Sequence, residues 1–477
     1  MGQSSEDRLP AGLWGIAAVA ILGSFLAQLD ATVVNVSLSS LATDLHAPLA
    51  EIQWVTSGYL LALALMLPLN SWLVDRVGTR NLYLGCFIAF SLASALCGVA
   101  WSPGSLIGFR VLQGMSGGLL APMAQLTLAR AAGKHMAKVF GYAALPILLG
   151  PVVGPVLAGA ILSHASWRWL FLINVPVGTI ALLLAWKVLP KDGAAEERRA
   201  LDLRGLLLLS PALVLLLYAA DHVRERSGWW LMAASFALLS LFLLHARRLQ
   251  ERALIDLKLF RGAFSISVAT QFMSNGIAFA GQFLVPYFLV KVYATSPSKT
   301  GWLMAPLGLG MMCVYPTMGA MTKRFGVRQV AGVGASVALL GSLPFLWLAT
   351  HGLSVPVLEL SLFIRGMGMS SVGIPSITSA YAAVEKRSLP MATTALNIVQ
   401  RLGGPIWTTV VATFLAWSWS GRASVLQQPK PLFAMAFGLL IVMHALQLFF
   451  ALQLPRAMPE QPKAEELRRE ELEAVES

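Results

Sequence analysis

Long apolar stretches recur along the whole chain and constrain its fold more than any other feature. Fourteen of them are long enough to cross a bilayer, whose ~30 Å hydrocarbon core needs about 20 apolar residues per helix. In lipid a helix satisfies all its backbone hydrogen bonds internally, so the sequence predicts an all-α polytopic membrane protein. The predicted spans are 12–38, 51–74, 81–100, 104–130, 136–163, 168–189, 205–223, 229–247, 264–292, 300–322, 328–350, 355–381, 391–417 and 432–454.

The positions of the basic residues predict the orientation of these spans. With the N-terminus inside, 25 of the 35 Lys and Arg residues fall on the inner side and only seven on the outer side. This is the asymmetry of the positive-inside rule. We therefore expect a multi-pass protein of the inner (plasma) membrane with both termini cytoplasmic. The same placement accounts for the net charge of +12, so no nucleic-acid partner is expected.

Two charged internal segments divide the chain. Residues 191–204 and 247–262 are the most charged stretches between spans, and they bracket the seventh and eighth spans. The predicted organisation is two six-helix halves with two extra linker helices between them. Its parts are an N-terminal six-helix bundle (1–190), a linker with two membrane helices (191–262), a C-terminal six-helix bundle (263–455) and a cytoplasmic tail (456–477).

The two halves also resemble each other in sequence. SWLVDRVGTR (71–80) follows the second span and GAMTKRFGVR (319–328) follows the tenth, with basic residues and a glycine at the same offsets. The fourth span (GFRVLQGMSGG, 108–118) and the twelfth (LFIRGMGMSSVG, 362–373) each place an arginine ahead of small residues. Two parallel repeats are typical of transporters whose substrate site lies near the midplane between the halves.

Asp30 is the principal candidate for chemistry. Ionisable groups inside apolar spans are rare and costly, and each indicates a functional site. Asp30 in the first span has a natural partner in Arg110 of the fourth span. Loss of hydration disfavours the ionised carboxylate, whereas a nearby guanidinium favours it. A movement that changed their separation would change proton occupancy, so Asp30 is the predicted proton site. The alternative is that Asp30 is an ordinary polar residue near the end of its helix.

The loop after the second span is the candidate gate. Asp75, Arg76 and Arg80 would pair with helix ends across the cytoplasmic gap in one conformation, and Gly78 would form the tight turn. Ordinary flanking charge is the alternative.

The fifth span has an unusual density of helix-modifying residues. Its stretch 145–162 contains Gly150, Pro151, Gly154 and Pro155. Proline kinks a helix and glycine permits close helix approach, so this span is predicted to have a specific packing role. A generic flexible span is the alternative.

Polar residues within spans are candidates for substrate binding, with interhelical hydrogen bonding as the alternative for each. They are Gln28, Asn35, Gln113, Gln125, Asn174, Gln271, Asn275, Gln282, Asn397 and Gln400. Arg365 and Arg401 join them as charged candidates. If Arg110, Arg365 and Arg401 all face a central cavity, its charge is net positive against Asp30 alone, which favours neutral or anionic amphiphiles over dicationic compounds.

These motifs resemble the major facilitator superfamily, and within it the fourteen-helix drug:proton antiporters. The resemblance covers residues 12 to about 455. LDATVVNVSL (29–38) is similar to that family's first-span signature, 71–80 to the superfamily's loop motif and RVLQG (110–114) to its fourth-span motif. GPVVGP (150–155) resembles the antiporter motif of the fifth span, and NIVQRLGGP (397–405) resembles the thirteenth span.

The resemblance implies a role for each motif. Asp30 and Arg110 would be the proton-coupling pair, and Asp75, Arg76 and Arg80 the gating latch. The Gly-Pro motif of the fifth span would form the packing surface between the halves.

The expected function is proton-driven export of amphiphilic compounds by alternating access. A specific exporter or importer of a lipid-like or anionic metabolite is the main alternative, and a channel or membrane-bound enzyme a remote one. No catalytic residue, cofactor or metal is expected, because the proton gradient supplies the energy. The expected partners are the bilayer and a small amphiphilic substrate; we expect a monomer, and a periplasmic adaptor is left open.

Overall fold

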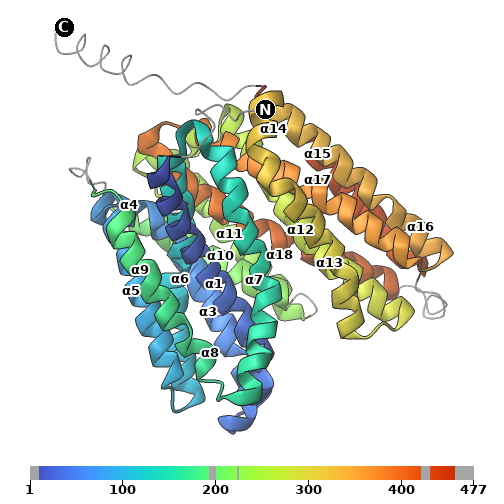
Figure 1. Cartoon of the computed structure of the whole chain (residues 1–477), viewed down its shortest axis with the longest axis horizontal. Helices are drawn as coiled ribbons and strands as arrows, with labels where there is room; N and C mark the ends of the chain where they lie inside the picture. Colours follow the sequence, from blue (N-terminus) through green and yellow to red (C-terminus); the bar gives the residue numbers. More distant parts are fainter. Residues whose placement is uncertain (1–9, 193–199, 223–224, 421–429, 457–477) are drawn as a thin grey trace.

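The computed structural model describes residues 10–192, 200–222, 225–420 and 430–456. Throughout these residues the chain forms α-helices and short 3-10 turns, and no strand. Helices from the first part of the chain, blue to teal in Figure 1, lie on one side, and most of those from the last part, yellow to red, lie on the other. The prediction of an all-α fold is confirmed.

The N-terminal half, defined here as α1 to α9, contains the first six predicted spans. Several spans are interrupted, so the half has more helices than spans. Its helices are α1 (Ala11–Asp44), α2 (Leu49–Ile52), α3 (Trp54–Met66), α4 (Asn70–Val77), α5 (Thr79–Gly98), α6 (Pro103–Ala132), α7 (Met136–His164), α8 (Trp169–Leu172) and α9 (Asn174–Val188).

The linker pair and the C-terminal half follow. The linker pair is α10 (Leu203–Asp221) and α11 (Arg226–Leu249). The C-terminal half comprises α12 (Gly262–Tyr293), α13 (Pro297–Val314), α14 (Met318–Phe325), α15 (Val327–Ser342), α16 (Pro344–His351), α17 (Val355–Ala382), α18 (Leu389–Ser420) and α19 (Lys430–Ala451).

Proline accounts for several of the interruptions. Because it lacks a backbone N–H, proline disrupts a helix interior. Pro68 lies in the 3-10 turn Leu67–Leu69 between α3 and α4, and Pro316 lies in the corresponding turn Tyr315–Thr317 between α13 and α14. Pro344 starts α16 after α15 ends. The second and tenth spans are therefore broken at equivalent places.

Eleven segments of the described chain are long and apolar enough to cross a membrane. The predicted spans 104–130, 136–163 and 391–417 lie in α6, α7 and α18 and are not among those eleven. These helices are 30, 29 and 32 residues long, so length does not exclude them. The count of fourteen stays a prediction.

The repeated loops of the two halves adopt the same conformation. Gly78 has φ 90° and ψ 159°, and Gly326 has φ 79° and ψ 162°. Glycine is required at both because side chains disfavour positive φ. The Arg80 guanidinium donates to the Trp186 carbonyl near the end of α9, and the Arg328 guanidinium donates to the Leu454 carbonyl after α19. Each loop thus contacts the last span of its own half.

The halves meet at the end of the molecule that carries these two loops, called the inner end below. There Asn70 of α4 donates to the Thr394 hydroxyl of α18 at 3.2 Å. The Gln125 side-chain oxygen of α6 accepts from the Tyr381 hydroxyl at 2.8 Å and from Asn397 at 2.9 Å. The halves are therefore joined at the inner end in this conformation.

Candidate functional site

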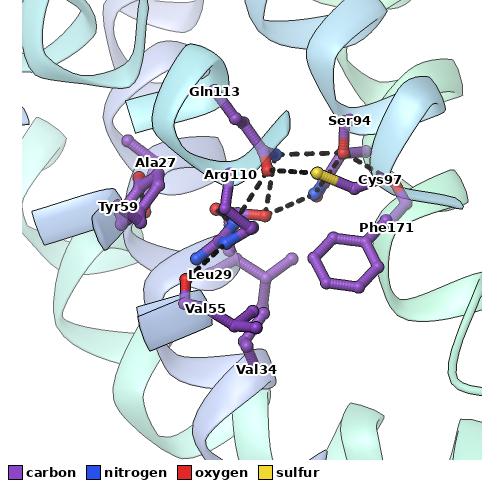
Figure 2. Close-up of polar contacts among 12 residues, drawn as sticks. Ala27, Leu29, Val34, Val55, Tyr59, Ser94, Cys97, Arg110, Gln113 and Phe171 are labelled. Carbon is purple, nitrogen blue, oxygen red and sulfur yellow. Dashed lines mark hydrogen bonds and ion pairs between the residues drawn. The ribbon is translucent and has the colours of Figure 1, made fainter. Parts of the chain in front are cut away.

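A buried ion pair lies in the interior of the N-terminal half. Arg110 of α6 donates to Asp30 Oδ2 of α1 at 2.6 Å, and both side chains are fully buried (Figure 2). A buried pair is stable only when further hydrogen bonds satisfy its remaining polar atoms. This pair has such bonds.

Three more polar residues complete the environment of the carboxylate. Gln113 and Asn174 donate to Asp30 Oδ1 at 3.0 and 2.8 Å. The same two amides donate to the Ser94 hydroxyl, at 3.0 and 3.1 Å. Asp30, Ser94, Arg110, Gln113 and Asn174 are called the carboxylate cluster below. It joins α1, α5, α6 and α9 through side chains that are at most 1% exposed.

The guanidinium of Arg110 is held on several sides. Its Nη1 also donates to the Gln113 side-chain oxygen at 2.8 Å, and its Nε donates to the Val55 carbonyl at 3.1 Å. The Tyr59 ring lies 4.1 Å from the guanidinium carbon and the Phe171 ring 5.6 Å from it, both in cation–π range. Its Nη2 has no hydrogen-bond partner among the described residues.

The sequence of α6 explains how the cluster assembles. Gln113 is three residues after Arg110, so the two side chains share one helix face. A Cβ on Gly114 would lie 2.4 Å from the Tyr59 carbonyl, and one on Gly118 would lie 2.6 Å from the Leu63 carbonyl. The two glycines let α6 approach α3 closely, which brings Tyr59 over the guanidinium.

Every hydrogen bond that the carboxylate of Asp30 makes among the described residues is donated to it by a neighbouring side chain. An ionised carboxylate accepts hydrogen bonds and donates none, and all three side chains around Asp30 act as donors to it. A proton on the carboxyl would remove the charge that compensates Arg110. Removing one partner of a buried ion pair is strongly destabilising, so the pair holds α1 and α6 together.

Arg80 of the predicted gating loop contacts its own half. Arg80 donates to the Trp186 carbonyl at 2.6 Å and not to a helix end of the other half. Asp192, which the sequence reasoning missed, accepts from the backbone N–H groups of Arg80 and Asn81 at 3.0 to 3.2 Å, at the start of α5. A Cβ on Gly78 would lie 2.3 Å from the Asp192 carboxylate, so the glycine is also needed for this contact.

The other two loop residues differ in exposure. Asp75 is partly buried near the end of α4, and Arg76 is exposed.

The fifth-span motif packs against the helix that carries Asp30. A Cβ on Gly150 would lie 2.8 Å from Gln28 Cγ, and one on Gly154 would lie 2.2 Å from the Thr32 hydroxyl. Gln28 and Thr32 flank Asp30 on α1. The expected packing surface between halves is therefore not formed by these glycines in this conformation. The side chains of Pro151 and Pro155 lie outside the described part of the chain.

The contacts of α7 with the other half lie nearer its start. A Cβ on Gly141 would lie 2.4 Å from the Tyr315 carbonyl, and the Phe140 and Tyr381 rings are 6.0 Å apart. The halves approach each other at the inner end, which explains why the motif further along α7 meets α1 instead.

Three polar candidates of the C-terminal half form an interhelical network. Gln271 of α12 donates to the Gly373 carbonyl at 2.5 Å and the Ser376 hydroxyl at 2.6 Å of α17. Its side-chain oxygen accepts from Gln400 of α18 at 3.1 Å, and Asn275 donates to its backbone carbonyl at 3.0 Å. Gln271 is 2% exposed, whereas Asn275 and Gln400 are half-buried and present surface for a ligand.

The remaining polar candidates occupy different places. Gln113 belongs to the carboxylate cluster, and Asn397 donates to Gln125 across the inner end. Gln28 is half-buried beside α7. The side chain of Asn35 lies outside the described part of the chain.

The three span arginines are not equivalent. Arg110 and Arg365 are 0% and 1% exposed and lie inside their own halves, so neither lines an open cavity. Arg365 donates to the Ile277 carbonyl at 3.0 Å, and a Cβ on Gly281 would lie 2.1 Å from its guanidinium. Arg401 of α18 is half-buried. Of these three arginines, Arg401 is therefore the one whose side chain has exposed surface.

The chain matches a known protein family. The Major Facilitator Superfamily model matches residues 20–408 and 264–476. The chain belongs to the major facilitator superfamily. It is accordingly a secondary transporter and not an enzyme, as the sequence predicted.

Curated relatives share most of the chain. The Multidrug resistance protein B homolog of Mycobacterium tuberculosis is 36% identical over 428 residues, which cover 88% of this chain and 79% of that protein. The Putative multidrug resistance protein MdtD of Escherichia coli is 30% identical over 450 residues, which cover 88% of this chain and 93% of the relative.

Solved structures share the fold at low sequence identity. The proton:xylose symporter XylE superposes with a TM-score of 0.65 at 15% identity, covering 95% of this chain and 99% of that one. The human organic anion transporter MFSD10 gives a TM-score of 0.61 at 18% identity, covering 93% and 100%.

Proposed function

We propose that this transporter exports amphiphilic compounds across the inner membrane in exchange for protons, and that Asp30 carries the exchanged proton. The observation that carries the proposal is the buried ion pair between Asp30 and Arg110, 2.6 Å apart. The names of the curated relatives, multidrug resistance proteins, support export of drug-like compounds.

The orientation follows from the charge asymmetry. The inner end, with its basic loops, faces the cytoplasm. The described ends of the chain support this assignment: Gly15 of α1 packs against Val188 at the end of α9, and the Leu454 carbonyl accepts from Arg328. Both ends therefore lie at the inner end. The halves are joined there, so this conformation is closed toward the cytoplasm.

In the proposed cycle, protons reach Asp30 from the outside. Protonation of Asp30 ends its ion pair, while Arg110 keeps its bonds to Gln113 and to the Val55 carbonyl. Because α1 carries the carboxylate and α6 the guanidinium, loss of the pair frees the two helices to shift relative to each other. α7 moves with α1, since Gly150 and Gly154 pack directly against it.

Substrate occupies the space between the halves and is exchanged for the proton. Half-buried Asn275, Gln400 and Arg401 on α12 and α18 supply its polar contacts. Of the three span arginines only Arg401 has exposed surface, and it has no ion pair with an acid among the described residues. This charge favours neutral and anionic amphiphiles over dications. It equally suits the second candidate function, specific transport of a lipid-like or anionic metabolite.

Transport in everted membrane vesicles tests the proposal. Uptake of amphiphilic dyes should require an imposed pH gradient, should stop on addition of a protonophore and should be lost in Asp30→Asn. Glu359→Gln is the matched control, because Glu359 is an exposed carboxylate on α17, away from the cluster. Undiminished gradient-dependent uptake by Asp30→Asn would refute the assignment. A broad range of accepted dyes supports drug export, and a single accepted anion supports the second candidate.

A further inference from the structure

A pocket lies where the linker pair joins the C-terminal half. It is formed by the last two turns of α11 and the segment that leads to α12, and its volume is about 510 Å³. Arg247, Lys258 and Arg261 line it together with Gln250, and Asp256 is the one acidic residue in its wall. This pocket, called the linker pocket below, is not part of the transport site described above.

The charges of the linker pocket leave two arginines available to a ligand. Asp256 accepts from the backbone N–H of Lys258 at 2.9 Å, and the Lys258 ammonium pairs with Glu251 at 2.9 Å. The side chains of Arg247 and Arg261 are exposed, and neither has an ion pair or hydrogen bond within the described part of the chain. The pocket therefore offers two unpaired guanidinium groups at one site.

The wall of the linker pocket is also apolar, and it continues onto an apolar helix face. Leu243, Leu257 and Phe260 line the pocket beside the charged groups. Along α11, Phe236, Leu241, Leu243 and Leu244 are 45% to 54% exposed. The segment Arg226–Arg252 is apolar enough to cross a membrane, yet only 17% of its apolar 18-residue window is buried inside the protein. This face of α11 is thus suited to contact with acyl chains.

We infer that the linker pocket binds the headgroup of an anionic phospholipid, whose acyl chains lie along the exposed apolar face of α11. Guanidinium groups form paired hydrogen bonds with phosphate oxygens, and basic pockets beside cytoplasmic helix ends suit anionic headgroups. Arg247, the first arginine of the pocket, lies one helical turn beyond exposed Leu243. A bound phospholipid could therefore place its acyl chains beside Leu243 and its phosphate beside Arg247.

A lipid at this site would tie the linker to the transporting halves. The backbone N–H of Asp256 lies 3.1 Å from the Met391 sulfur at the start of α18. Asp202 at the start of α10 accepts from His245 of α11 at 2.8 Å and from the backbone N–H of Leu254 at 3.1 Å. The segment that lines the pocket thus contacts α10, α11 and α18, so a bound headgroup stabilises their mutual arrangement.

Native mass spectrometry of the full chain in detergent, titrated with phosphatidylglycerol, tests the inference. Arg247→Gln/Arg261→Gln should weaken phosphatidylglycerol binding roughly 30-fold, because each basic group contributes about a factor of five at an anionic lipid. Arg248→Gln/Arg252→Gln removes the same charge from exposed neighbours outside the pocket lining and should weaken binding less than about threefold. All four side chains are exposed, so folding should not be affected.

Two further titrations identify the source of the phosphate. Phosphatidylcholine and free glycerol phosphate should each bind far more weakly than phosphatidylglycerol. Three outcomes would each overturn the inference. Phosphatidylcholine could bind as tightly as phosphatidylglycerol, both double variants could lose the same affinity, or glycerol phosphate could bind as tightly as phosphatidylglycerol. The first two outcomes would indicate non-specific contact, and the third a site for a soluble phosphate.

Discussion

The coupling between Asp30 and Arg110 can be measured as a free energy. Asp30→Asn removes the negative charge and replaces one acceptor oxygen by an N–H donor. Both carboxylate oxygens are in use, Oδ2 by Arg110 and Oδ1 by Gln113 and Asn174. Whichever way the new amide is oriented, one donor of the cluster therefore faces another donor.

The expected cost follows from burial and distance. The paired atoms are 2.6 Å apart with no exposed surface, and removing one partner of such a buried pair costs about 3–5 kcal/mol. Arg110→Gln should cost a similar amount, because it leaves the carboxylate alone. The double variant removes both charges, so it should be more stable than the sum of the single variants predicts. We expect a coupling free energy of about 2–3 kcal/mol.

Denaturant unfolding of the purified protein in mixed micelles provides the assay. The free energy of unfolding is measured for the wild type, the two single variants and the double variant. Additive single-variant effects would refute the reasoning, because the ion pair would then contribute nothing beyond its separate residues. Ser37→Ala is the control, because it removes a buried polar group from the same helix. Among the described residues, the Ser37 hydroxyl donates only to the Val34 carbonyl of α1 itself.

Three further predictions concern α7, the loop and the central space. Gly154→Leu should lower the free energy of unfolding by about 1–3 kcal/mol and reduce transport, because its Cβ would lie 2.2 Å from a hydroxyl of α1. Gly159→Leu is the control: its side chain enters open space, so it should have little effect. Asp192→Ala should remove about 0.5–2 kcal/mol of stabilisation from the first turn of α5. Amide hydrogen exchange should become faster there, and it should not change in the control variant Lys191→Ala. Arg401→Gln should raise export of dicationic dyes relative to anionic ones on the order of tenfold, measured in vesicles.

Each of these predictions has a contrary outcome. Equal effects of the two α7 substitutions would show that helix contact at α1 is unimportant. Unchanged exchange at the start of α5 would show that the Asp192 carboxylate does not cap it. An unchanged ratio of dication to anion export would remove Arg401 from substrate selection.

The sequence predicted the carboxylate cluster in part. Asp30 and Arg110 stood out because a charged residue inside an apolar span has few reasons to be there. Gln113 and Asn174 were recognised as polar span residues, but their roles could not be assigned. Ser94 carried no signal, because serine is common in membrane helices as a small residue. Only the helix arrangement shows that it accepts from both amides.

The features that the sequence did not predict depend on contacts between segments far apart in the chain. The glycine motif of α7 predicts close approach to some helix, but small size does not specify the partner, which proved to be α1 of the same half. Asp192 lies 112 residues from Arg80, and nothing in the local sequence connects them. The repeat of 71–80 in 319–328, by contrast, was readable, because a glycine at positive φ is needed at both turns.

Proton release on substrate binding tests the central claim most directly. Purified protein in weakly buffered detergent solution is mixed with an exported amphiphile, and the pH change is recorded with an indicator. If Asp30 carries the exchanged proton, the wild type releases up to about one proton per bound substrate and Asp30→Asn releases none while still binding substrate. Equal proton release by Asp30→Asn and the wild type would contradict the account.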